Sequence, residues 1–114
     1  MKQPEAVKPE YVIVIHGGAG SSDPANFSQE KQDLYKTELN KALAIGESIL
    51  ASGGTGIKAI EKTINYLEDC PLFNAGKGAV FTHEGRNELD ASIMSGVDLS
   101  AGAITCVTDI KNPI

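Results

Sequence analysis

A continuous apolar run that ends in glycines constrains the fold of this chain more than any other feature. Residues 11–15 read YVIVI, and His16 leads from them into the sequence GGAG. Because apolar and mostly β-branched residues occupy every position instead of alternate ones, the run predicts a β-strand that is buried on both faces. Such a strand needs a layer of structure on each side. The sequence therefore predicts an α/β (α+β) protein.

Two helices are predicted after this strand. Apolar residues recur at spacings of three and four between residues 35 and 50, which is typical of an amphipathic helix, and Gly53 with Gly54 closes it. Thr55 then supplies a side-chain cap for a second helix, whose apolar stripe at residues 57–67 continues until Pro71. We therefore expect two neighbouring helices joined by a short turn.

The second half of the chain predicts about three antiparallel strands. Residues 79–82 and 88–96 have an extended pattern, and residues 83–87 between them, HEGRN, suit a hairpin loop. A turn at residues 97–100 leads to a further predicted strand at residues 101–109.

The chain has the size of one domain. It contains 114 residues, 41% of them apolar, which is enough for a modest core. The first ten residues are polar with two prolines, so we expect residues 1–10 to form a loose tail and residues 21–29 to form a polar loop. Residues 11–114 are expected to belong to a single domain.

Charge and cysteine content exclude several classes of partner. The net charge is -5 and no run of lysine or arginine occurs, so neither nucleic acid nor an anionic membrane is expected as a partner. No apolar run approaches the roughly 20 residues that span a bilayer, and the first ten residues lack the apolar segment of a signal peptide. Cys70 and Cys106 lie far apart and outside a C-x-x-C pattern, which favours reduced thiols and a cytoplasmic location.

The segment from Leu67 to Gly78 is open to three interpretations. A phosphate-binding loop requires G-x-x-x-x-G-K-[ST], but Lys77 is followed by Gly78, so a nucleotide site is disfavoured. A cation held by main-chain carbonyls is the second interpretation, because carbonyls at a helix C-terminus lack partners and Pro71 with the glycines favours a curled path. The third is a plain loop between a helix and a strand. A metal held by side chains is disfavoured, because residues 83–87 do not match H-E-x-x-H.

The glycines after the first strand are open to two interpretations. The amides of Gly17 and Gly18 can bind an oxyanion, as an H-G-G-type loop does in lipases and esterases, or the glycines can simply permit a close turn beside packed backbone. His16 suits a core residue as well as a base. An esterase also needs a G-x-S-x-G elbow, which is absent. An esterase-like hydrolase and a non-catalytic α/β binding module are therefore the alternatives at this point.

Three segments, taken in order, resemble the plant-type asparaginase and isoaspartyl peptidase family of N-terminal-nucleophile hydrolases. They are IHGGAG at residues 15–20, LEDCPLFNAGKGAVFT at residues 67–82 and ELDASIMSG at residues 88–96. The resemblance covers essentially residues 11–114. One departure is Ser95, where the family pattern leads us to expect an aspartate.

The resemblance implies a four-layer αββα sandwich and a precursor that cuts itself before a threonine, which becomes the nucleophile. This chain would be the front part of the α subunit, partnered by a β subunit from the same precursor in a dimer of αβ units, that is, a heterotetramer. The implied reactions are hydrolysis of the side-chain amide of asparagine and of β-aspartyl (isoaspartyl) dipeptides. No organic cofactor is implied.

The resemblance also implies roles for individual residues. Asn74 would lie near the nucleophile and donate to the developing oxyanion, while Gly17 and Gly18 would line the same centre. A structural sodium ion would be held by the main-chain carbonyls of Leu67, Glu68, Cys70, Phe73, Ala75 and Lys77. The nucleophilic threonine would be absent from this chain, because the residues after Thr55 have helical spacing and Thr55 is therefore expected to be a helix cap.

Overall fold

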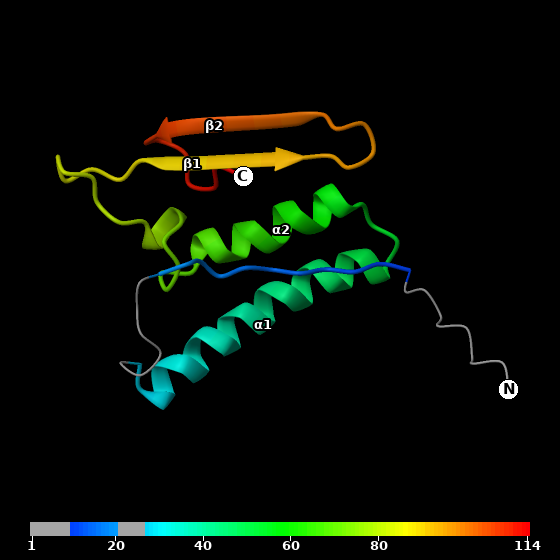
Figure 1. Ribbon diagram of the computed structural model, residues 1–114, viewed down its shortest axis with the longest axis horizontal. Helices are drawn as coiled ribbons and strands as arrows, with labels where there is room; N and C mark the ends of the chain where they lie inside the picture. The colour runs from blue at the N-terminus through cyan, green and yellow to red at the C-terminus, as the bar shows by residue number, and fades with distance from the viewer. Residues whose placement is uncertain (1–9, 21–26) are drawn as a thin grey trace, which may run out of the picture.

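The structure is a computed structural model that describes residues 10–20 and 27–114 (Figure 1). The expected tail at residues 1–9 and the first part of the expected loop, residues 21–26, lie outside the described residues. The elements, in chain order, are the helices α1 (Gln29–Ala51) and α2 (Gly56–Asp69), the short 3₁₀ helix η2 (Gly76–Gly78), and the strands β1 (Leu89–Met94) and β2 (Ala101–Val107). Two helices and a two-stranded sheet confirm the predicted α+β class.

Helix α1 begins and ends at residues with capping side chains or glycines. The Ser28 hydroxyl accepts a hydrogen bond from the Lys31 N–H at 3.2 Å and caps the helix, which starts at Gln29. The helix therefore begins before residue 35, where the apolar spacing that predicted a helix begins. At the other end Gly53, with φ of 80°, donates its N–H to the Leu50 carbonyl at 3.0 Å. Glycine adopts this left-handed conformation without strain, which confirms that a glycine closes the helix.

Helix α2 has the predicted cap and the predicted end. The Thr55 hydroxyl accepts a hydrogen bond from the Lys58 N–H at 3.2 Å, and the helix begins at the next residue. It ends at Asp69, two residues before Pro71. Thr55 is therefore a helix cap in the structure, as the sequence predicts.

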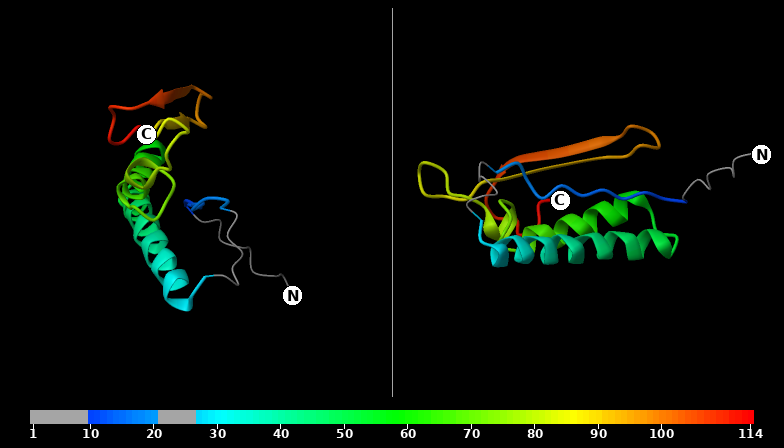
Figure 2. Two further views of the ribbon diagram at one scale, coloured as in Figure 1. Left: turned by 90° about the vertical axis from the view of Figure 1, so that its left-hand side faces the viewer. Right: turned by 60° about the horizontal axis from the view of Figure 1, so that its bottom comes forward.

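Small residues form the contact between the two helices. Ala42 and Gly46 of α1 are buried, as are Ala59 and Thr63 of α2. A Cβ atom added at Gly46 would lie only 2.5 Å from the Thr63 hydroxyl oxygen, so the helices approach too closely there for a larger residue. In Figure 1, α2 lies between α1 and the β1–β2 hairpin, and the left view of Figure 2 shows the same order.

The predicted first strand differs from the structure. Residues 11–20 are assigned to no strand, and they run beside the two helices (Figure 1). Exposure alternates along the segment: Val12 is 74% exposed and Val14 86%, whereas Ile13 is half-buried. The segment is therefore not buried on both faces in the described residues, and its burial within a longer protein stays a prediction. The physical reason is that a strand requires a hydrogen-bonded neighbour, and the only strand pair described here joins β1 to β2.

The β1–β2 hairpin confirms two of the predicted strands and the turn between them. The strands pair antiparallel, from Leu89 opposite Val107 to Met94 opposite Ala101. The register shifts at Asp90, whose carboxylate accepts hydrogen bonds from the Cys106 N–H at 2.8 Å and the Thr105 hydroxyl at 2.7 Å.

The predicted strand at residues 79–82 is wrong, because these residues form part of a loop. The hairpin turn itself occurs where the sequence places it, since the Thr82 N–H donates to the Arg86 carbonyl at 2.7 Å. Instead of a ladder, the Asn87 side-chain amide donates to the carbonyls of Ala79 and Val80. The described residues therefore contain a two-stranded sheet and not a three-stranded one.

Many large apolar side chains of this structure are exposed. Outside the helices they lie on the segment before the glycines, the loop before β1, the hairpin and the residues after it: Val12, Val14, Val80, Phe81, Met94, Val97, Leu99, Ile104 and Ile110. Leu34, Ile57 and Ile60 of the helices are also exposed. The described helices include none that is long and apolar enough to cross a membrane.

We expect the 114-residue chain alone to be aggregated or molten. Exposed apolar surface and unpaired strand edges favour association, and a net charge of -5 opposes it only weakly at physiological salt. The chain should therefore bind a hydrophobic dye and melt without a cooperative transition. Calorimetry and light scattering test this, and a monodisperse monomer with a sharp transition would contradict it.

Candidate functional site

One open groove joins segments that are far apart in the sequence. Its volume is ≈ 950 Å³. The lining comes from the glycine turn (residues 16–20), from α1 and the residue Phe27 shortly before it, and from the end of α2 with the loop after it. The lining residues are His16 to Gly20, Phe27, Gln32, Tyr35, Lys36, Leu39, Leu67 and Leu72 to Ala75. The structure therefore brings together Gly17, Gly18 and Asn74, the three residues predicted for the catalytic centre.

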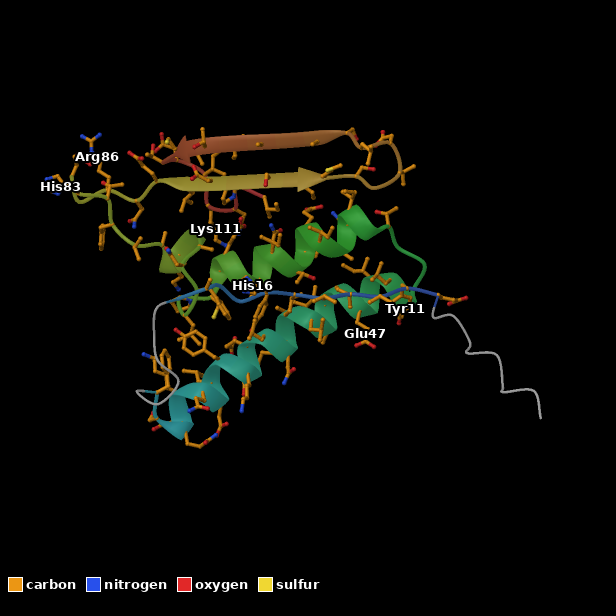
Figure 3. All side chains as sticks on the ribbon, viewed as in Figure 1. Tyr11, His16, Glu47, His83, Arg86 and Lys111 are labelled. Carbon is orange, nitrogen blue, oxygen red and sulfur yellow. The ribbon has the colours of Figure 1, made fainter. Side chains whose placement is uncertain are left out.

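The glycine turn packs closely against α1 and against the loop after α2. A Cβ atom added at Gly17 would lie 3.0 Å from Leu39 Cδ2 and 3.3 Å from Phe73 Cε1. Gly18 has φ of 113°, which side chains disfavour. These glycines therefore combine close packing with a place in the lining of the groove, so close packing does not rule out the oxyanion interpretation. His16 also lies beside this loop (Figure 3).

Asn74 is held by a hydrogen bond within its own loop. Its side-chain Oδ1 accepts from the Val80 N–H at 2.9 Å. Because an N–H can only donate, the accepting atom is fixed as the oxygen, and Nδ2 is the atom that can donate to a ligand. No hydrogen bond of Nδ2 occurs among the described residues. The side chain is exposed and lines the groove.

The loop that carries Asn74, residues 70–78, curls back on itself; we call it the Asn74 loop. The Ala75 N–H donates to the Phe73 carbonyl at 2.8 Å, and the Gly78 N–H donates to the Ala75 carbonyl at 3.0 Å. A Cβ atom added at Gly78 would overlap the Phe73 carbonyl oxygen and lie 2.7 Å from the Pro71 carbonyl oxygen. Glycine is therefore required where the loop closes.

The Asn74 loop also has features that fit a cation held by carbonyls. The carbonyl oxygens of Glu68 and Lys77 accept no backbone hydrogen bond from the described residues outside the helices. Pro71 has no N–H, so it cannot donate a hydrogen bond to the Glu68 carbonyl. The Glu68 carbonyl also approaches the loop where it returns, because a Cβ atom on Gly76 would meet it. Hard cations accept oxygens of this kind.

The Glu68 side chain has a separate structural role, which the sequence did not reveal: it binds the last residues of the described chain. It is only 3% exposed, and its carboxylate accepts hydrogen bonds from the Asn112 side chain at 3.0 Å and from the Ile114 N–H at 3.1 Å. Next to it, a hydrogen bond from Lys111 holds the pKa of Asp69 below its usual value. Two acidic residues in the last turn of a helix interact unfavourably with the helix dipole. Their presence in the sequence is therefore a signal that they have hydrogen-bond or ion-pair partners.

Comparison with known proteins identifies the family. The model of the family described as Asparaginase matches residues 9–114. The chain belongs to this family. The match includes the glycine turn, the Asn74 loop and the hairpin, which confirms the resemblance found in the sequence.

Curated relatives of this chain carry consistent names. An isoaspartyl peptidase/L-asparaginase from Bos taurus is 44% identical over 103 residues, which cover 90% of this chain and 32% of the relative. An isoaspartyl peptidase from Salmonella typhimurium is 41% identical over 103 residues, covering 90% of this chain and 33% of the relative. An isoaspartyl peptidase/L-asparaginase from Homo sapiens is 41% identical over 103 residues, which cover 90% of this chain and 32% of the relative. The chain thus spans about a third of the length of these relatives.

Proposed function

We propose that this chain forms the α-subunit part of an isoaspartyl peptidase/L-asparaginase. The observation that carries the proposal is the groove, because Gly17, Gly18 and Asn74 all line it. The nucleophile is a threonine at the N-terminus of a β subunit, which the precursor exposes by cutting itself. The family match and the names of the relatives support this assignment over an esterase-like enzyme or a binding module.

The chemistry divides between the two subunits. The threonine hydroxyl attacks the side-chain carbonyl carbon of asparagine or of a β-aspartyl dipeptide, and the threonine amino group takes the hydroxyl proton. Negative charge then develops on the carbonyl oxygen. Asn74 Nδ2 donates to this oxygen, and the amides of Gly17 and Gly18 line the same centre. This chain therefore supplies the oxyanion side of the site.

We also propose that the Asn74 loop holds a sodium ion through the six carbonyls named from the resemblance. The carbonyls of Glu68 and Lys77, which accept no backbone hydrogen bond from the described residues outside the helices, support this role. The other four carbonyls each accept one backbone hydrogen bond, so they would bind the ion through their second lone pair. The ion fixes the path of the loop, and no organic cofactor takes part.

The charge of the groove supports an anionic substrate. Within the described residues no aspartate or glutamate lines it, although the chain as a whole is acidic. Lys36 lines the groove and is exposed. The two substrates differ in their leaving group. A β-aspartyl dipeptide releases an amino acid, which carries a carboxylate, whereas asparagine releases ammonia, which carries none. We therefore propose that isoaspartyl peptidase activity is the principal one.

The exposed surfaces are consistent with the proposed assembly. We propose that residues 11–15 and the β1–β2 hairpin enter the two sheets of a four-layer αββα sandwich, completed by the β subunit, and that two αβ units form a dimer. Val12 and Val14 are then covered by the second half of the enzyme. We propose a cytoplasmic location, which the two free cysteines favour.

The proposal is tested in a full-length enzyme, in which these 114 residues are followed by the remaining part of the protein that family members have. We expect it to cleave itself before a threonine and to hydrolyse a β-aspartyl dipeptide but not the α-aspartyl isomer. The 114-residue chain alone should release no ammonia from asparagine, because it lacks the nucleophile. Mass spectrometry of the mature chains and an amino-acid release assay measure both results. Ammonia release by the 114-residue chain above a blank would contradict the proposal.

A further inference from the structure

We propose that Tyr35 and Glu38 of α1 are positioning residues that hold the Asn74 loop, and with it Asn74, in the groove. The two residues lie one helical turn apart, so their side chains share one face of α1. The inference rests on the proposed function only where it concerns turnover. The positioning itself is measured separately, by hydrogen exchange of the Val80 amide.

Tyr35 holds the middle of the Asn74 loop in two ways. Its hydroxyl donates a hydrogen bond to the Leu72 carbonyl at 3.0 Å. Its ring packs edge-on against the ring of Phe73, with centroids 5.8 Å apart. Both partners directly precede Asn74. The hydrogen bond also directs the Leu72 carbonyl toward α1, and Leu72 is not among the carbonyls proposed to bind sodium.

Glu38 holds the start of the same loop. Its Oε2 accepts a hydrogen bond from the Tyr66 hydroxyl at 2.5 Å and a weaker one from Cys70 Sγ at 3.9 Å, while Oε1 pairs with Lys41 at 2.7 Å. The carboxylate is largely covered, with 15% of its side chain exposed. The hydrogen bond from Lys41 and then that from Tyr66 hold the pKa of Glu38 below its usual value. Glu38 therefore ties α1 to the last turn of α2 through Tyr66, and it touches the first residue of the loop, Cys70, through the weaker thiol contact.

The two attachments fix the loop on the α1 side before it reaches Asn74. Beyond Asn74, the hydrogen bond from the Val80 N–H to Oδ1 fixes the side chain. If the attachment at Leu72 is lost, its carbonyl must find another partner and the loop can shift. Such a shift moves Asn74 without changing any group that touches the substrate, which is how a positioning residue acts.

The first test is hydrogen exchange at Val80 in the full-length protein. Tyr35→Phe removes the hydroxyl but keeps the ring beside Phe73, so we expect the Val80 amide to exchange about 10-fold faster. Glu38→Ala should have a similar effect, and Glu38→Gln, which still accepts hydrogen bonds, should restore most of the protection. Tyr11→Phe is the matched control, because Tyr11 does not line the groove, and it should change nothing. Unchanged exchange at Val80 in Tyr35→Phe would overturn the proposal.

The second test is a double-mutant cycle on turnover of a β-aspartyl dipeptide. Tyr35→Phe should lower kcat about 10-fold when Asn74 is present. In an Asn74→Ala background the same change should lower kcat less than about 2-fold, because Tyr35 acts through Asn74. An equal loss in both backgrounds would overturn the positioning role. If the unmodified enzyme hydrolyses no dipeptide, the proposed function fails, and hydrogen exchange at Val80 still decides whether Tyr35 holds the loop.

Discussion

We expect the replacement of Asn74 by alanine to lower kcat for a β-aspartyl dipeptide by about 10²-fold in the full-length enzyme, and we expect the variant still to fold and to cleave itself. The loss is expected because Nδ2 is the donor that the loop leaves available, while Oδ1 is occupied by the Val80 N–H. Steady-state kinetics measure the effect. KM should change less than kcat, since the interaction strengthens as charge develops on the carbonyl oxygen.

Asn74→Asp is the matched variant for this prediction. A carboxylate still accepts a hydrogen bond from the Val80 N–H, so the loop keeps its path, but it has no N–H to donate. We therefore expect a loss at least as large as that of Asn74→Ala. Wild-type kcat in either variant would contradict the assignment of Asn74 as an oxyanion donor.

The largest effect on stability is expected at Gly78. A Cβ atom there would overlap the carbonyl oxygen of Phe73 and lie 2.7 Å from that of Pro71, and both are backbone atoms that cannot move alone. We expect Gly78→Ala to lower the free energy of unfolding of the full-length enzyme by about 3 kcal/mol or more. Denaturant unfolding measures the change.

Gly56→Ala is the control for Gly78. Gly56 is the first residue of α2, and a Cβ atom there would meet nothing within 4 Å. Because alanine is the better helix former, the free energy of unfolding should change by less than about 1 kcal/mol and in the stabilising direction. Equal behaviour of the two alanine variants would show that the Asn74 loop does not close as tightly as described.

The helices were predictable because their signals are local. The Thr55 cap, the glycines that close α1 and the stop at Pro71 act within a few residues of the chain, and the structure has each of them in place. The β1–β2 hairpin has the same property, since its strands are joined by a short turn. Local signals of this kind do not depend on the rest of the protein.

The other predicted strands depend on partners that a single sequence does not specify. Residues 11–15 have the composition of a buried strand, but pairing and burial on both faces require neighbours from elsewhere. Residues 79–82 instead form a loop, where Asn87 occupies the carbonyls of Ala79 and Val80. Composition indicated strand propensity, but neither segment is a strand in the described residues, because composition does not specify a partner.

The sequence named candidate residues that the structure brings together, but it did not predict how they approach one another. The resemblance named Gly17, Gly18 and Asn74, and the structure places all three around one groove. Their approach depends on the contact of Gly17 with Leu39 and Phe73, which no spacing reveals. Tyr35 and Glu38 were missed for a similar reason. On α1 they fit an ordinary amphipathic helix, and their polar atoms reach the Asn74 loop only in three dimensions.

A crystal structure of the full-length enzyme with bound L-aspartate tests the central claim most directly. The account predicts that an oxygen of the side-chain carboxylate lies within about 3.2 Å of Asn74 Nδ2 and faces the amides of Gly17 and Gly18. The N-terminal threonine hydroxyl should lie on the opposite side of the same carboxylate. An aspartate bound outside the groove, or Asn74 Nδ2 turned away and bonded to the protein, would contradict the claim that this chain supplies the oxyanion side of the site.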